Sequence, residues 1–195
     1  MTQRMNLLYP EWQGGRCPDV HRGAHWLAEA VFAGRGYVTI DAPAAQPGEL
    51  ESTAVVEGVY GLPAIAARVR AGAPYVGWSA GSNVACPTIM TTNDMPIVDP
   101  LGLDALGFVP FQINPHYLHG NPPGFKGETR EERILEFLAM NPQRTVAGLR
   151  EGAGFRVENG AIELVGDADC RVFRHGQAPL ELSPGDDCAF LLRAG

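Results

Sequence analysis

Apolar positions follow two different patterns along the chain, and the change falls near Glu151. Before it, short apolar runs alternate with segments whose apolar residues recur every three or four positions, as in helices that pack on one face. The pattern predicts helices at Gly23–Ala33 and Leu62–Arg70 and after Thr129, and strands at Met5–Leu8, Tyr37–Ile40, Pro74–Gly77 and Thr145–Gly148. Strands and helices that alternate at this pitch predict βαβ units and a mostly parallel sheet flanked by helices.

After Glu151 the apolar residues alternate with a period of two, as in half-buried antiparallel strands. Phe155–Val157 and Ala161–Val165 flank Asn159-Gly160, a dipeptide that favours a two-residue hairpin turn. Arg171–Arg174 and Cys188–Leu192 are predicted to be further short strands. We therefore expect one α/β domain over residues 1–195 that ends in antiparallel hairpins.

The helix after Thr129 has a distinct start signal. Thr129 can cap the helix, and Glu132 three residues later completes a capping box. The apolar residues that follow at helical spacing are expected to form the buried face, and they are Ile134, Phe137, Leu138 and Met140.

Composition narrows the class of protein. The chain has 195 residues, 45% of them hydrophobic and 19% charged, which suits one globular domain. Its net charge of −7 disfavours nucleic-acid and anionic-membrane partners, and no apolar run approaches the roughly 18 residues of a membrane span. The N-terminal residues lack a secretory pattern, and the four cysteines form no Cys-x-x-Cys pair. We expect a cytoplasmic protein with free thiols.

A candidate nucleophile lies where a predicted strand meets a helix-like segment. Gly77-Trp78-Ser79-Ala80-Gly81 fits the pattern G-x-S-x-G, in which glycines permit the strained turn that exposes a serine. The N–H of Ala80 is the expected donor to an oxyanion there. A simple small-residue turn between a strand and a helix fits the same letters.

A serine nucleophile needs a base, and the base needs a third group to orient it. His116 follows a short apolar stretch, and Glu151 follows the strand Thr145–Gly148, so both are expected at strand ends, where open α/β sheets build their sites. The chain order common in α/β-hydrolases would instead use His175 with Asp167 or Asp169, in a poorer position within a probable hairpin.

Metal and cofactor sites are not expected. His116 and His119 have the spacing of a metal pair, but acidic residues are scarce around them. Glycine-rich phosphate loops of the Walker and dinucleotide types are absent, so we expect no cofactor.

Four motifs follow one another between Tyr75 and the C-terminus: Gly77–Asn83, Thr91–Val98, Gln112–His116 and Lys126–Arg130. In this order they closely resemble the aspartyl dipeptidase (peptidase E) family, over about residues 61–195. The resemblance implies a fold like that of class I glutamine amidotransferases, and a Ser-His-Glu triad that removes N-terminal aspartate from Asp-X dipeptides in the cytoplasm without metal.

Matched residue by residue, the resemblance implies Ser79 as nucleophile, His116 as base and Glu151 as the orienting acid. It also implies Arg130 as the receptor of the aspartate carboxylate and Asp94 as an acid near the site. A guanidinium suits the receptor role because it forks onto a carboxylate through two parallel hydrogen bonds.

Residues 1–60 depart from the family. Where its glycine-rich oxyanion turn is expected, Val55–Tyr60 offers only Gly58. Leu7–Gly15 and His21–Ala24 show instead a weak similarity to the start of an arginase-family protein, but the Asp/His metal clusters of arginases do not follow. An exposed sheet edge in this part could be covered by a second copy of the chain, as in a homodimer.

The sequence is compatible with three functions. The first is a serine exopeptidase that cleaves Asp-X dipeptides. The second is a cyanophycinase-like hydrolase of β-aspartyl peptides, on the same fold. The third is a catalytically impaired scaffold or binding protein that lacks a complete oxyanion hole.

Overall fold

The computed structural model describes residues 4–7, 38–39, 62–93, 102–121 and 124–193. Its helices are α3 (Leu62–Arg70), α4 (Ala80–Val84), α5 (Arg130–Met140) and the 3-10 helix η2 (Ala189–Arg193). Its strands are β1 (Arg4–Leu7), β2 (Val38–Thr39), β3 (Tyr75–Val76), β4 (Gln112–Pro115), β5 (Thr145–Leu149), β6 (Ala153–Glu158), β7 (Ala161–Gly166), β8 (Cys170–Arg174) and β9 (Leu180–Leu182). The predicted helix Gly23–Ala33 lies outside the described residues.

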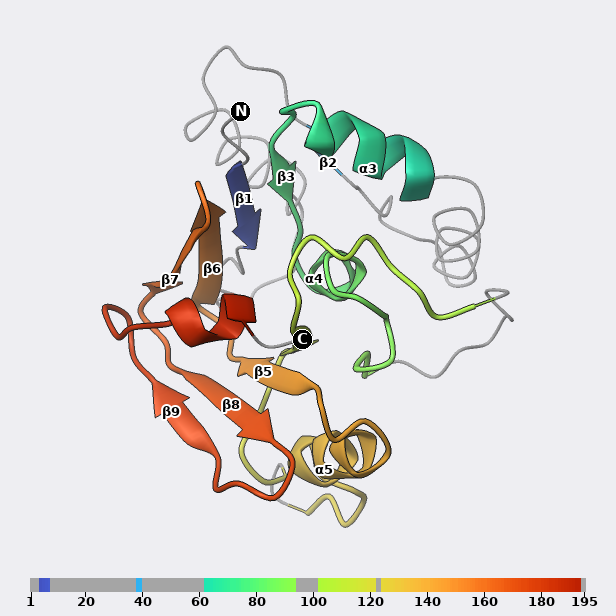
Figure 1. Ribbon diagram of the computed structural model, residues 1–195. Helices are drawn as coiled ribbons and strands as arrows, with labels where there is room; N and C mark the ends of the chain where they lie inside the picture. Colours follow the sequence, from blue (N-terminus) through green and yellow to red (C-terminus); the bar gives the residue numbers. More distant parts are fainter. Residues whose placement is uncertain (1–3, 8–37, 40–61, 94–101, 122–123, 194–195) are drawn as a thin grey trace.

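The strands form two sheets, one of five strands in the order β2-β3-β1-β6-β7 and one of four in the order β4-β5-β8-β9 (Figure 1). The α/β class and the C-terminal hairpins are confirmed. The prediction of a mostly parallel sheet is wrong for the described strands, because three pairings are parallel and four are antiparallel. Parallel pairs need long crossovers, whereas the short turns after Glu151 can join only antiparallel strands.

The hairpin turn and the helix start follow the sequence closely. Asn159 and Gly160 both have positive φ, as the turn between β6 and β7 requires. Thr129 caps α5, and Glu132 closes the capping box from both sides. Ile134 and Leu138 are buried, but Met140 is 83% exposed because α5 ends there.

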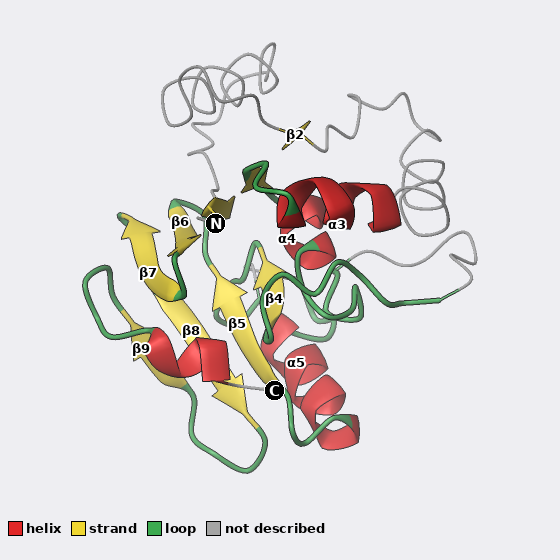
Figure 2. Cartoon of the chain, turned by 45° about the horizontal axis from the view of Figure 1, so that its top comes forward, coloured by secondary structure: helices red, strands yellow, loops and turns green. Residues whose placement is uncertain are grey.

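The four-stranded sheet separates two groups of buried side chains, because successive residues of a strand point to opposite faces. On β5, Val146 packs with α5, whereas Ala147 and Leu149 belong to the main core. On β8, Phe173 likewise packs with α5 and Val172 faces the main core. Figure 2 shows α5 beside β4 and β5.

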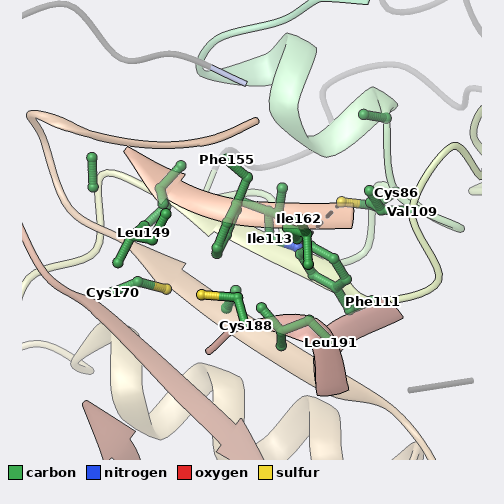
Figure 3. Packing of buried hydrophobic residues seen from close by; sticks show 14 of the residues in the cluster. Cys86, Val109, Phe111, Ile113, Leu149, Phe155, Ile162, Cys170, Cys188 and Leu191 are labelled. Atoms are coloured by element: carbon green, nitrogen blue, oxygen red, sulfur yellow. Dashed lines mark hydrogen bonds between the residues drawn. The ribbon is translucent and has the colours of Figure 1, made fainter. Parts of the chain in front are cut away.

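The main core lies where side chains of both sheets meet (Figure 3). Phe155 of β6 and Phe111 pack edge to face with ring centres 5.5 Å apart. The three described cysteines, Cys86, Cys170 and Cys188, are buried free thiols, and burial raises the pKa of Cys86 to about 12. These thiols stay protonated and pack as small apolar groups.

The predicted strand Cys188–Leu192 is wrong, because these residues enter the 3-10 helix η2. The Leu191 N–H donates to the Cys188 carbonyl at 2.9 Å, and the Asp187 carboxylate accepts from the Ala189 N–H at 2.8 Å. A local side-chain acceptor of this kind favours a helical turn over a strand. A short apolar run alone does not distinguish the two.

An ion cluster ties β5, β8 and β9 together. Arg150 forks onto the Glu181 carboxylate at 2.8 and 3.0 Å, and Arg171 reaches the same carboxylate at 2.7 Å. Mainly through the hydrogen bond from Arg150, the cluster lowers the pKa of Glu181 below its ordinary value of 4.5.

Glu181→Gln is expected to lower the free energy of unfolding at neutral pH more than in acid. Because the pKa of Glu181 is lower in the folded chain, its stabilising contribution is present above pH 4.5 and is lost as the pH falls through the folded-state pKa. Urea unfolding of both proteins at neutral and acid pH measures the difference. A difference that grows on acidification would contradict the prediction.

Candidate active site

Ser79 occupies a strained turn between β3 and α4, with φ 51° and ψ −118°. Non-glycine residues seldom adopt positive φ, and such strain is found mostly at functional sites. Neighbouring residues hold the turn, since the Tyr75 hydroxyl donates to the Gly81 carbonyl at 2.6 Å. The turn directs the Ser79 hydroxyl toward His116.

The turn also requires glycine at position 77. A Cβ added at Gly77 would lie 2.6 Å from the Gly81 carbonyl oxygen and 2.8 Å from the Tyr75 ring. At Gly81 the nearest atom to an added Cβ is the Tyr75 hydroxyl, at 3.9 Å. Close packing therefore excludes a side chain at Gly77, whereas the space at Gly81 would admit one.

Gly77→Ala is expected to lower the free energy of unfolding by about 1–3 kcal/mol, because the backbone at Gly81 cannot move aside cheaply. Gly81→Ala is the matched control, and it is expected to be neutral or slightly stabilising because Ala favours the helix. Denaturant unfolding measures both variants. Equal losses in both would contradict the steric argument.

The ends of two parallel strands bring the base and the acid together. β4 and β5 pair in parallel with Pro115 opposite Leu149, so the residues that follow each strand share one edge of the sheet. His116 follows β4 and Glu151 lies two residues after β5. The Nε2 of His116 is 2.9 Å from the Ser79 hydroxyl, and its Nδ1 is 3.5 Å from a Glu151 carboxylate oxygen.

The exposure of these side chains differs from that of a deeply buried triad. His116 is 30% exposed and Glu151 is 47% exposed. From this position Glu151 can accept a hydrogen bond from Nδ1 and hold the imidazole ring in one tautomer. The contact of 3.5 Å is at the long end of a hydrogen bond.

A cavity of about 110 Å³ opens beside Ser79 and contains Arg130, the first residue of α5. Its lining consists of Ser79, Ala80, Asn83, Thr92, Asn93, Pro115, His116 and Arg130. Four of the predicted site residues, Ser79, Ala80, His116 and Arg130, thus share one small polar cavity. Among the hydrogen bonds of the described residues none uses the N–H of Ala80.

Two predicted site residues, Gly58 and Asp94, lie outside the described residues. Asn93 was missed as a site residue by the sequence analysis, although it stands in the motif Thr91–Val98. The signal that points to it is structural: both ends of its side-chain amide are hydrogen-bonded, since Nδ2 donates to the Pro115 carbonyl at 2.7 Å and Oδ1 accepts from Asn114 at 2.7 Å.

The other histidines considered lie apart from Ser79. His119 is 3.4 Å from the Glu131 carboxylate. His175 lies in the turn between β8 and β9, and within the described part of the chain no hydrogen bond or ion pair joins it to Asp167 or Asp169. The described residues also contain no group of three or more His, Cys, Asp or Glu side chains that could hold a metal ion.

Comparison with known proteins places the chain in a family. The model of peptidase family S51 matches residues 55–165. Peptidase E of Nostoc sp. is 50% identical over 125 residues, which cover 64% of this chain and 52% of its own length. Peptidase E of Salmonella arizonae is 56% identical over 124 residues, which cover 64% of this chain and 54% of its own length. The chain spans about half the length of the curated relatives it matches.

A solved structure supports the fold. The crystal structure of a putative peptidase E protein from Listeria monocytogenes EGD-e has a TM-score of 0.50 at 15% identity, over 86% of this chain and 100% of that chain. The family match covers more than half of the chain and includes Ser79, His116 and Glu151. The chain belongs to peptidase family S51, the peptidase E family.

Proposed function

We propose that the chain is a serine exopeptidase that hydrolyses dipeptides with N-terminal aspartate. The observation that carries the proposal is the contact of 2.9 Å between the Ser79 hydroxyl and the His116 Nε2, in a cavity that also contains Arg130. Membership of a peptidase family makes a peptide the expected substrate. The curated relatives named peptidase E support this activity.

In the proposed reaction, Ser79 attacks the scissile carbonyl while His116 takes its proton at Nε2. Glu151 stabilises the imidazolium that forms, and His116 then protonates the leaving amine. Water attacks the acyl-enzyme in the same way and releases aspartate. The N–H of Ala80, which lines the cavity, donates to the oxyanion in both steps.

Arg130 is proposed to select aspartate. It begins α5, whose N-terminal end favours negative charge, and its guanidinium can bind a carboxylate through two parallel hydrogen bonds. The small cavity suits one short side chain. Asp94 as a nearby acid and Gly58 as a second oxyanion donor keep the roles that the family resemblance implies.

The setting of the reaction is part of the proposal. The three described cysteines are free thiols, which supports a reducing cytoplasm. Within the described ranges no helix is long and apolar enough to cross a membrane. A homodimer is proposed as well, and sedimentation velocity tests it.

A substrate panel tests the proposed function. The protein is incubated with Asp-Leu, Asn-Leu, N-acetyl-Asp-Leu and β-Asp-Leu, and the released amino acids are measured. Asp-Leu is expected to be hydrolysed at least about 10-fold faster than Asn-Leu, which lacks the carboxylate charge. N-acetyl-Asp-Leu is expected to resist hydrolysis, because an exopeptidase requires the free amino group.

Three results would contradict the proposal. Equal rates on Asp-Leu and Asn-Leu would show that the enzyme does not recognise the side-chain carboxylate of aspartate. Faster hydrolysis of β-Asp-Leu would favour the cyanophycinase-like function. Binding of Asp-Leu by a folded protein without turnover would favour the impaired scaffold.

A further inference from the structure

His116 has a backbone conformation that only its surroundings can maintain. Its φ of 55° lies in the left-handed region, which is unfavourable for a residue with a side chain. Both neighbouring residues are fixed by hydrogen bonds. The Tyr117 N–H donates to the Leu149 carbonyl at 3.0 Å, and the Pro115 carbonyl accepts from the Asn93 side chain at 2.7 Å.

The Tyr117 side of this arrangement is part of the core. Tyr117 is fully buried, and an added Cβ at Gly148 would lie 2.7 Å from its ring. Its hydroxyl donates to the Glu131 carboxylate at 2.9 Å. The Asn93 side lies at the cavity wall and depends on one side-chain amide.

The Asn93 amide is held in one orientation. Asn114, which is only 4% exposed, donates its Nδ2 to the Asn93 Oδ1 at 2.7 Å and to the Thr91 carbonyl at 3.0 Å. Because the Asn93 oxygen is bound in this way, its Nδ2 must face the Pro115 carbonyl. An amide flip would place two NH₂ groups against each other.

Asn93 also contacts the helix that carries Arg130. The Arg133 guanidinium donates to the Asn93 backbone carbonyl at 3.2 Å, and Arg133 lies one turn after Arg130 on α5. Asn93 therefore connects the segment that carries His116 to α5, the helix that carries Arg130.

We propose that Asn93 is a positioning residue. Its side-chain amide binds the Pro115 carbonyl, holds His116 at its left-handed φ, and so keeps Nε2 of His116 within hydrogen-bond distance of the Ser79 hydroxyl. Without this hydrogen bond His116 relaxes toward negative φ and its ring moves away from Ser79. The kinetic consequence rests on the proposed function, whereas the geometry of the imidazole does not.

A second polar pair on the same strand provides a matched control. The Gln112 side chain hydrogen-bonds both the N–H and the hydroxyl of Thr88 at the start of β4. It joins the same two segments as Asn93 does, but four residues before His116. Thr88→Val removes hydroxyl hydrogen bonding there without touching the cavity lining.

The experiment compares Asn93→Ala, Asn93→Asp and Thr88→Val with the unaltered protein. Asn93→Asp keeps the size of the side chain and the acceptor for Asn114 but loses the donor to Pro115. Two quantities are measured: kcat and KM on Asp-Leu, and the ¹H–¹⁵N NMR signals of the His116 imidazole, with Ser79→Ala as the reference for a ring that has lost its serine contact.

Both Asn93 variants are expected to lose about 10- to 100-fold in kcat, since small displacements of a catalytic group are costly. Their His116 Nε2 signal is expected to move toward that of Ser79→Ala, while Thr88→Val keeps the unaltered signal and kcat. Unchanged His116 signals in folded Asn93 variants, or equal changes in Thr88→Val, would overturn the inference. If the unaltered protein does not hydrolyse Asp-Leu, the proposed function fails and the imidazole spectrum alone decides the role of Asn93.

Discussion

Replacing Ser79 with alanine is expected to lower the release of aspartate from Asp-Leu by about 10⁴-fold or more, because the substitution removes the nucleophile that forms the acyl-enzyme. The hydroxyl is the only atom removed, and the turn that carries it depends on Gly77 and Tyr75 rather than on the hydroxyl. The free energy of unfolding is therefore expected to change little. Initial rates, measured with the unaltered protein at equal concentration, test the prediction.

Ser82→Ala is the matched control for this substitution. Ser82 lies three residues further on and is buried, and its hydroxyl donates a long hydrogen bond of 3.4 Å to the Gly77 carbonyl. Its removal is expected to leave kcat within about threefold of the original value, because the group touches neither cavity nor base. Loss of activity in Ser82→Ala but not in Ser79→Ala would contradict the assignment of the nucleophile.

Arg130→Lys is expected to raise KM for Asp-Leu by about 10- to 100-fold, with a smaller effect on kcat. Lysine keeps the positive charge, but it cannot form two parallel hydrogen bonds to a carboxylate, and one charge-assisted hydrogen bond is worth about 1.5–3 kcal/mol. Steady-state kinetics on Asp-Leu and Ala-Leu measure the effect, since Ala-Leu has no side-chain carboxylate to lose.

The matched control for Arg130 is Arg68→Lys on the exposed face of α3. This substitution is expected to leave both constants unchanged. If Arg130→Lys raised KM equally for Asp-Leu and Ala-Leu, Arg130 would bind a group that both dipeptides share, and its role as receptor of the aspartate side chain would be wrong.

Local signals in the sequence predicted the elements that depend on local physics. Thr129 and Glu132 form a capping box within one helical turn, and Asn159-Gly160 fits its hairpin turn with two positive φ angles. Such features need no knowledge of distant residues. The helix Leu62–Arg70 was predicted with the bounds that α3 has in the structure.

Features that depend on distant residues were predicted less well. The direction in which β6 pairs with β1 is set by how the hairpin meets a strand from the other end of the chain, and no periodicity contains this information. The apolar run Cys188–Leu192 becomes η2 because Asp187 offers a local acceptor and Leu191 fills the core.

The proposed site shows the same division. Ser79 stands in a recognisable turn, and His116 and Glu151 could be placed at strand ends, but only the register of β4 against β5 brings those ends together. In the sequence Arg130 cannot be distinguished from an ordinary first-turn residue of a helix. Only the structure shows that it lines the same cavity as Ser79. Asn93 shows its hydrogen-bond partners only in three dimensions.

The central claim, that Ser79 forms an aspartyl-enzyme during Asp-X hydrolysis, is tested most directly by adding hydroxylamine as a competing nucleophile. Asp-Leu and aspartyl p-nitroanilide differ in leaving group but would pass through the same acyl-enzyme. We predict the same ratio of aspartyl hydroxamate to aspartate from both substrates, and neither product from Ser79→Ala. A ratio that changes with the leaving group, or product formation that survives in Ser79→Ala, would contradict the claim.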